Sequence, residues 1–354
     1  MALSSKKIRV MIVDDSMLAR RMLQTGLSKY PNIQVVGEAI NAMDARRKIP
    51  LLHPDVITMD VEMPGMNGIE FVKSILPEYP IPIILVSSLN LRVFDALAVG
   101  AVDFVRKPDG KIMNNDQFIQ NLANKIVVAS CARVRKPMVR STVASAVAAA
   151  SNVAPLHMSG LPTETIIALG ASTGGTEATL EVLKRLPANT PGMVIVQHMP
   201  PGFTKMYAER LDRNCPMHIK EAENGDVIQP GCALIAPGDK QMRVVRTGTR
   251  YTVSCQQGPK VSGHCPSVDA LFQSMAQSVL CHMVGIIMTG MGSDGAKGLL
   301  EMRKRGAFTI GQDKDSCVVY GMPMVAYNIG AVEQQASCES IAGVVVRHLS
   351  SLRR

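Results

Sequence analysis

Three short apolar runs in the last two-thirds of the chain each end just before a polar residue that can take part in catalysis. They are Ile166–Leu169 before Ser172, Val194–Val196 before His198, and Ile286–Met288 before Asp294. Continuous runs of this kind are typical of parallel strands buried on both faces. Sites in open α/β sheets form beyond the carboxyl ends of such strands. The sequence therefore predicts that a serine, a histidine and an aspartate meet at one sheet edge.

The composition favours a two-domain globular protein. The chain has 354 residues, 47% of them apolar, which is more than one ordinary core needs. Its formal net charge of +9 is modest for this length, there is no Trp, and no basic stripe interleaves with aromatic residues. These features argue against nucleic acid as a partner.

The cysteines and the apolar segments favour a cytoplasmic protein. The eight cysteines include no C-x-x-C pair, so reduced thiols are expected rather than a zinc site or a disulfide framework. The first residues contain no apolar signal core, and no stretch has the unbroken apolar length of a bilayer span. We expect a cytoplasmic location.

The first domain, residues 1–134, repeats a strand and a helix five times. This alternation predicts a parallel sheet with helices on both faces, an α/β fold. The expected strands are Ile8–Asp14, Gln34–Ala39, Asp55–Asp60, Ile81–Ser87 and Asp103–Arg106. Residues 135–162 are rich in Ser, Ala, Val and Pro without periodicity and are predicted to be a flexible linker, although the Ala-rich run Ala144–Ala150 leaves a helix open there.

The second domain, residues 163–354, again alternates strands and helices and is predicted to be a doubly wound, mostly parallel sheet. The expected helices are Glu177–Leu186, Thr204–Arg213, Val268–Val279, Ala296–Arg305 and Ser340–Leu352. The segment Cys232–Cys255 has the glycine and proline punctuation of hairpins, so a small antiparallel insertion is expected there.

Polar and charged residues stand at the ends of four of the five predicted strands of the first domain. They are Asp14 and Asp15 after the first strand, Asp60 after the third, Ser87 after the fourth and Lys107 after the fifth. Three crowded carboxylates favour a hard divalent cation such as Mg²⁺, which leaves Asp60 able to accept a phosphoryl group. The Ser87 hydroxyl and the Lys107 ammonium can then contact the added phosphate. Each signal alone is weak, since a polar loop start or a Lys-Pro turn is common.

In this arrangement residues 8–132 resemble the receiver domain of two-component response regulators, which has a flavodoxin-like (βα)5 fold. The loop Met63–Gly68 also looks like that family's. Phe104 falls where the family usually has a switching aromatic, although a core phenylalanine explains that residue nearly as well. The resemblance implies phosphorylation at Asp60 by a histidine kinase.

Ser172 lies in a tight glycine turn, Gly170–Gly175, directly before a predicted helix. A helix N-terminus offers free N–H groups and partial positive charge to an oxyanion. A serine needs a base at neutral pH, and His198 fits that role, with Asp294 orienting its ring. The order Ser, His, Asp differs from that of α/β-hydrolases. A dinucleotide loop is disfavoured because the spacing is G-x-x-x-G-G.

Two residues near this site have a second explanation. Asp294 can cap the predicted helix Ala296–Arg305, and Ser267 can cap the helix that starts at Val268. His264, just before that helix, is placed to line the cleft. The backbone amides of Thr173 and Met291 are the expected oxyanion donors.

Residues 165–349 resemble the catalytic domain of the chemotaxis protein-glutamate methylesterases. The matching stretches are Gly170–Glu177, Gln197–Thr204, His264–Phe272, Thr289–Ala296 and Val318–Pro323. The resemblance implies that Ser172, His198 and Asp294 form a catalytic triad acting on glutamyl methyl esters of chemoreceptors, with deamidation of receptor glutamines. Gln241 stands where many members appear to carry histidine, which leaves any role carried over to that position open.

The resemblance also implies regulation and partners. Phosphorylation by the chemotaxis histidine kinase relieves occlusion of the cleft by the receiver, and ester hydrolysis needs no cofactor. We expect a monomer that meets membranes only through its receptors. Two alternatives stay open: a response regulator whose output domain is a non-catalytic partner-binding module, and a deamidase with little esterase activity.

Overall fold

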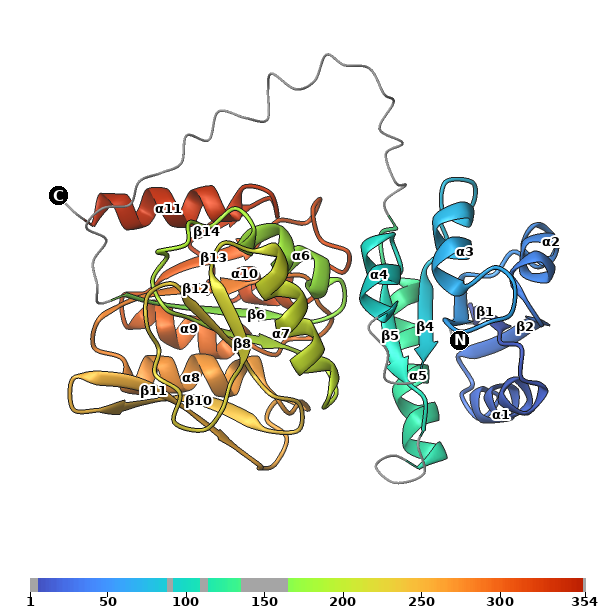
Figure 1. The fold of residues 1–354 in the computed structure, drawn as a ribbon, viewed down its shortest axis with the longest axis horizontal. Helices are drawn as coiled ribbons and strands as arrows, with labels where there is room; N and C mark the ends of the chain where they lie inside the picture. Colours follow the sequence, from blue (N-terminus) through green and yellow to red (C-terminus); the bar gives the residue numbers. More distant parts are fainter. Residues whose placement is uncertain (1–5, 88–91, 109–113, 135–164, 353–354) are drawn as a thin grey trace, which may run out of the picture. The chain divides into compact units, whose positions relative to one another are not determined.

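The chain forms two compact units, Met1–Met138 and Val139–Arg354, and each is described by itself. The computed structural model describes residues 6–87, 92–108, 114–134 and 165–352 (Figure 1). The predicted linker, residues 135–162, and its Ala-rich run lie outside the described residues. None of the helices in these ranges combines the length and apolar character needed to cross a membrane.

The first unit is a five-stranded parallel sheet of order β2-β1-β3-β4-β5. This is the flavodoxin-like order, and it confirms the predicted fold class. The strands are β1 (Ile8–Val13), β2 (Ile33–Ala39), β3 (Val56–Asp60), β4 (Ile83–Ser87) and β5 (Asp103–Arg106). The helices are α1 (Met17–Leu27), α2 (Ala42–Leu52), α3 (Gly68–Ile75), α4 (Arg92–Ala98) and α5 (Asn115–Ser130).

The second unit is built on a seven-stranded parallel sheet of order β14-β13-β12-β6-β7-β9-β8. Its strands are β6 (Thr165–Ala171), β7 (Met193–Gln197), β8 (His218–Glu221), β9 (Cys232–Ile235), β12 (His282–Ile287), β13 (Phe308–Gln312) and β14 (Gln334–Ala336). The chain winds outward from β6 through β7 on one side and from β12 through β13 on the other. The strand order reverses between β6 and β12, which is where open sheets of this type form a crevice.

Helices cover both faces of this sheet, with α8 and α9 on one face and α6, α7 and α11 on the other (Figure 1). The helices are α6 (Gly175–Leu183), α7 (Phe203–Asn214), α8 (Val268–Ser278), α9 (Ala296–Lys304), α10 (Met322–Asn328) and α11 (Ile341–Ser351). All five helices predicted for this unit are present, with no end more than three residues from its predicted position.

The prediction of a small antiparallel insertion at Cys232–Cys255 was only partly right. Its later part forms an antiparallel hairpin of β10 (Gln241–Thr247) and β11 (Arg250–Gln256). Its first part, β9, instead joins the main sheet, paired in parallel with β7 and β8. All four residues of β9 are buried, which is what a strand inside a parallel sheet requires.

Strand β13 and helix α10 were not among the predicted elements, and neither were the two polar strands β8 and β14. Both lie at the edges of the seven-stranded sheet, and β14 exposes two of its three residues. An edge strand pairs on one side only and needs no continuous apolar run, so its pattern is weak in the sequence.

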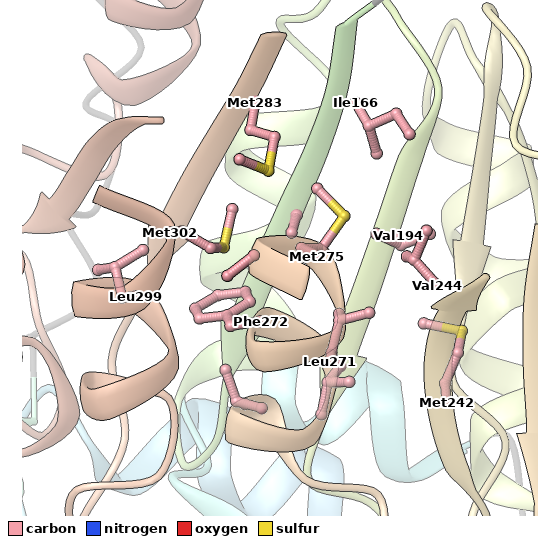
Figure 2. Packing of buried hydrophobic residues seen from close by; sticks show 14 of the residues in the cluster. Ile166, Val194, Met242, Val244, Leu271, Phe272, Met275, Met283, Leu299 and Met302 are labelled. Atoms are coloured by element: carbon pink, nitrogen blue, oxygen red, sulfur yellow. The ribbon is translucent and has the colours of Figure 1, made fainter. Parts of the chain in front are cut away.

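The core of the second unit is centred on α8 (Figure 2). Phe272 and Met275 of α8 gather with Met302 of α9 and Met283 of β12, all of them buried. Helices α8 and α9 approach so closely that a Cβ added at Gly298 would lie 2.7 Å from Cβ of Phe272. This packing fixes the N-terminal end of α8, which contributes to the site described below.

We expect Phe272→Ala to lower the free energy of unfolding of the second unit by about 3–5 kcal/mol, because Phe272 is fully buried and truncation leaves a cavity. Native-state hydrogen exchange of the β6 and β12 amides measures this loss. The control Leu280→Ala changes a 73% exposed residue and should stay within about 0.5 kcal/mol of the parent. A loss below about 1 kcal/mol for Phe272→Ala would contradict the packing.

Candidate functional site

Ser172 lies at the carboxyl end of β6, in a turn that leads directly into α6. Its N–H donates to the carbonyl of Thr289 (3.0 Å), and its own carbonyl accepts from the N–H of Gly175 (2.7 Å). The turn needs a left-handed residue, and Gly174 supplies it with a φ of 77°. Strand, turn and helix together hold the Ser172 hydroxyl at a helix N-terminus, as the glycine pattern predicted.

His198 directly follows β7, the strand paired with β6, and its side chain contacts Ser172. Its N–H donates to the carbonyl of Ala171 (3.1 Å), which extends the pairing of β6 with β7 by one residue. Its side-chain Nδ1 lies 3.1 Å from Oγ of Ser172, and its Nε2 lies 2.8 Å from Oδ2 of Asp294. The three predicted residues are therefore in contact. We call this hydrogen-bonded series the Ser172–His198–Asp294 relay.

Asp294 is almost fully buried at the N-terminus of α8. Its carboxylate accepts from the Ser267 hydroxyl (2.8 Å), from the Val268 N–H (2.8 Å) and from the Asp269 N–H (2.9 Å). Burial raises the pKa of Asp294, but the hydrogen bonds from His198 and from these two amides outweigh it and hold the pKa below its ordinary value. Asp294 is therefore ionised at neutral pH.

The alternative explanation of Asp294 as a cap of the following helix was wrong. The N-cap residue of α9 is Gly295, and no side chain caps that helix. Asp294 instead accepts hydrogen bonds from the N-terminal amides of α8, a helix that precedes it in the sequence. Ser267 does cap α8, since its hydroxyl accepts from the Ala270 N–H at 3.2 Å, as predicted, and it also donates to Asp294.

The tautomer of His198 follows from its two partners. The ionised carboxylate of Asp294 only accepts hydrogen bonds, so Nε2 of His198 carries the proton. Nδ1 then has a free lone pair facing the Ser172 hydroxyl, which is the arrangement that a general base needs. The two ring nitrogens have exchanged places relative to the chymotrypsin-type relay, where Nε2 faces the serine.

Two side chains outside the Ser172–His198–Asp294 relay support this site. The ring of His264 stacks on that of His198, with centroids 3.8 Å apart and an interplanar angle of 9°. The Gln197 amide donates to the carbonyl of Ser172 at 2.8 Å. The sequence predicted that His264 lines the cleft but not that its ring stacks on His198, and it predicted no role for Gln197, because nothing near these residues in the sequence specifies what they contact.

The two expected oxyanion donors lie beside Ser172. Thr173 follows it directly and is buried, with its carbonyl accepting from the Thr289 hydroxyl at 3.0 Å. Met291 follows Gly290, which packs so tightly that an added Cβ would lie 2.6 Å from Cβ of Ser172. The amides of Thr173 and Met291 thus belong to the two loops that flank the hydroxyl, and their catalytic role stays a prediction.

In the first unit, three carboxylates meet at the carboxyl edge of the sheet. Oxygens of Asp14, Asp15 and Asp60 lie within 4.8 Å of one another, with Asp14 and Asp60 buried and Asp15 exposed. Nζ of Lys107 lies 2.7 Å from Oδ2 of Asp60 and 3.2 Å from Oδ2 of Asp14. The Lys107 ammonium thus contacts two of the three carboxylates, and the remaining negative charge and the all-oxygen donor set fit a hard divalent cation.

Burial and neighbouring charges shift the pKa values of Asp60 and Lys107. Burial raises the pKa of Asp60, and the hydrogen bond and charge of Lys107 offset only part of that effect. Burial lowers the pKa of Lys107, but its contacts with Asp60 and Asp14 outweigh burial and raise the pKa above the ordinary value. Lys107 therefore stays charged and Asp60 is less readily ionised than a free carboxyl.

The predicted switch residues lie on the neighbouring strands. Ser87 is fully buried at the end of β4, and its hydroxyl has no hydrogen-bond partner among the described residues. Phe104 of β5 is buried too, with its ring centroid 6.3 Å from that of Phe94 in an edge-on arrangement. An unpaired buried hydroxyl is costly, so Ser87 is available for a further acceptor such as a phosphoryl oxygen.

Comparisons with known proteins agree with this arrangement. Residues 167–345 match the family model described as CheB methylesterase, and residues 10–115 match the response regulator receiver domain. The chain is 50% identical over 348 residues to a protein-glutamate methylesterase/protein-glutamine glutaminase of Syntrophomonas wolfei, covering 98% of this chain and 99% of that protein. A protein of the same name from Syntrophotalea carbinolica is 47% identical, with 98% and 99% covered.

One solved structure is similar to the second unit. The catalytic domain of the Thermotoga maritima CheB methylesterase superposes with a TM-score of 0.51 at 34% sequence identity. The match covers 54% of this chain and 99% of that domain.

We expect Asp60→Asn to make the first unit more stable than the parent at pH 7 in the absence of metal. A raised carboxyl pKa means that ionisation of Asp60 disfavours the folded state, a cost that is absent at low pH and grows as the pH rises through the raised pKa. Asparagine cannot ionise, so the gain should disappear below the ordinary aspartate pKa of about 4.

Urea unfolding in EDTA, followed by hydrogen exchange of the β1 and β3 amides at pH 7 and pH 4, measures this difference. Asp116→Asn is the control, because the Asp116 side chain is 88% exposed. If Asp60→Asn is less stable than the parent at pH 7, the contact of Asp60 with Lys107 stabilises the fold more than burial of the Asp60 charge destabilises it.

Proposed function

This chain belongs to the CheB methylesterase family, and we propose that it hydrolyses glutamyl methyl esters of chemoreceptors, releasing methanol in chemotactic adaptation. The relay of Ser172, His198 and Asp294 is the observation that carries this proposal. The names of the full-length relatives support both the ester substrate and a second activity on glutamine side chains. A non-catalytic partner-binding module is disfavoured, since binding alone does not require an oriented serine, base and buried carboxylate.

In the proposed reaction, Ser172 Oγ attacks the ester carbonyl while Nδ1 of His198 takes the hydroxyl proton. The proton on Nε2 stays hydrogen-bonded to Asp294, whose negative charge stabilises the imidazolium. The amides of Thr173 and Met291 donate to the oxyanion of the tetrahedral intermediate. Collapse breaks the bond to the methoxy oxygen, which takes the proton from His198 and leaves as methanol.

Water completes the cycle. His198 removes a proton from water, the resulting hydroxide attacks the acyl-serine, and the proton returns to Ser172 Oγ as the product leaves as a glutamic acid side chain, which loses its remaining proton to solvent. The same steps on a glutamine side chain release ammonia in place of methanol. Deamidation by this site is therefore part of the proposal, and no cofactor is needed for either reaction.

The first unit is a receiver domain, and we infer that Asp60 accepts a phosphoryl group from the chemotaxis histidine kinase. Asp14, Asp15 and Asp60 would hold Mg²⁺, which neutralises carboxylate and phosphoryl charge during the transfer. Lys107 binds a phosphoryl oxygen as a fixed cation, and the buried Ser87 hydroxyl donates to another. Phe104 responds to the binding of the phosphoryl group by the Ser87 hydroxyl and transmits this change to the surface of the domain, which regulates the esterase.

We further infer a monomeric, cytoplasmic protein. Its partners are the kinase as phosphodonor and the methyl-accepting chemoreceptors as substrates, through which alone it meets the membrane. No nucleic acid partner is proposed.

Replacement of Ser172 by alanine should lower methyl ester hydrolysis by about 10⁴-fold or more, because removal of the nucleophile from such a relay removes most of the rate. Radiolabelled methanol release from receptor membranes measures the loss, and receptor mass spectrometry follows deamidation in the same samples. The control Ser293→Ala removes an exposed hydroxyl of the Asp294 loop and should keep the parent rate. Near-parent turnover by Ser172→Ala would end the proposal.

Stimulation of methanol release by acetyl phosphate should be lost in Asp60→Ala while the unstimulated rate persists. The reason is that Asp60 is buried beside two other carboxylates and makes the shorter of the two Lys107 contacts, 2.7 Å against 3.2 Å for Asp14. Asp116→Ala should respond to acetyl phosphate like the parent. Persistent stimulation of Asp60→Ala would place the phosphorylation site elsewhere.

A further inference from the structure

Gln241, the first residue of β10, is buried against the loop that precedes α8 and binds that loop with both ends of its carboxamide. Its Nε2 donates to the carbonyl of Pro259 (3.1 Å) and to the carbonyl of His264 (3.0 Å). Its Oε1 accepts from the Ser267 N–H at 3.0 Å. Both donors and one acceptor of the side chain are thus used on a single segment, residues 259–267, which we call the 259–267 loop.

This loop carries two side chains that contact the relay. The imidazole of His264 stacks on His198, with ring centroids 3.8 Å apart. The Ser267 hydroxyl donates to Oδ1 of Asp294 at 2.8 Å. The base and the carboxylate of the relay are therefore each in contact with a residue whose backbone is hydrogen-bonded to Gln241.

The turn within the loop is held by its own backbone and by one side-chain hydrogen bond to α8. Val261 and His264 exchange two backbone hydrogen bonds of 3.0 and 2.9 Å across Ser262 and Gly263, both of which have positive φ. The Ser262 hydroxyl donates to Asp269 at 2.7 Å. These contacts shape the turn, whereas Gln241 fastens the loop to β10.

We propose that Gln241 is a positioning residue for ester hydrolysis: its carboxamide fixes the 259–267 loop so that His264 holds the plane of the His198 ring and Ser267 holds the Asp294 carboxylate. The inference rests on the proposed function. The side-chain hydrogen bonds of Gln241 go to the 259–267 loop and not to Ser172, His198 or Asp294, so it acts through His264 and Ser267.

The hydrogen-bonding groups of the Gln241 carboxamide explain why a glutamine suits this position. Two carbonyl oxygens and one N–H must be bound from the same buried position, and a carboxamide offers donors and an acceptor at its two ends. Methionine has a similar length but leaves all three backbone groups without this partner. Histidine offers one donor and one acceptor, so it can replace part of the pattern.

The test compares Gln241→Met with the parent in the full chain. We expect kcat for methanol release to fall about 10- to 100-fold, the cost of a relay displaced by roughly 1 Å, with KM for receptor membranes changed less than about twofold. The rate of Ser172 labelling by a fluorophosphonate should fall in parallel. Gln241→His should retain more of both rates than Gln241→Met, which a loss of stability alone does not predict.

The matched control is Ser274→Ala. The Ser274 hydroxyl accepts from the Val244 N–H at 2.8 Å and so also joins β10 to α8, but it makes no contact with the 259–267 loop. This variant should keep the parent kcat even where it lowers the melting temperature. A Gln241→Met kcat within about twofold of the parent, or equal to that of Ser274→Ala, would overturn the inference.

A double variant tests whether Gln241 acts through Ser267. Gln241→Met combined with Ser267→Ala should lose less than the product of the two single losses, since both act on the same carboxylate. Strictly multiplicative losses would also overturn the inference. Failure of the proposed function is distinguishable, because it would appear as undiminished hydrolysis by Ser172→Ala, whereas fluorophosphonate labelling tests the position of Gln241 without any receptor.

Discussion

The buried carboxylate of Asp294 is the group on which the geometry of the candidate site depends. It accepts hydrogen bonds from the Ser267 hydroxyl, from the first two amides of α8 and from Nε2 of His198. These donors hold the charge in a position from which water is excluded, and they fix which ring nitrogen of His198 carries the proton. A carboxylate with fewer donors would be costly to bury and free to rotate. The packing of α8 around Phe272 is therefore part of the machinery that orients the base.

The sheet topology explains how distant residues form one site. Ser172 and Asp294 are far apart in the sequence, yet β6 and β12 are adjacent and parallel, so their carboxyl ends coincide. His198 arrives from β7, the other neighbour of β6. The receiver unit uses the same rule, since its acidic residues and Lys107 follow the first, third and fifth strands. In both units a rigid parallel sheet delivers side chains from several segments to one edge, where the loops complete the chemistry.

The receiver site and the esterase site handle buried charge in opposite ways. Asp294 is surrounded by donors, so its pKa is held down and the charge is permanent. Asp60 is buried with other carboxylates and one lysine, so its pKa is raised and its ionised state is less favourable. The first arrangement suits a constant electrostatic role. The second suits a group whose charge is altered by a cation or a covalent modification, which is what a switch requires.

The sequence by itself determined the residues at the strand ends, the glycine turns and the alternation of strands and helices, because these are set by local pattern. It did not reveal β8 and β14, whose polar residues pair on one side only, or the place of β9 in the main sheet. It also could not show that Asp294 binds the start of α8 rather than the helix that follows it, that His264 stacks on His198, or that Gln241 fastens the 259–267 loop. Each of these contacts joins segments distant along the chain, and only the packed tertiary structure decides which of them meet.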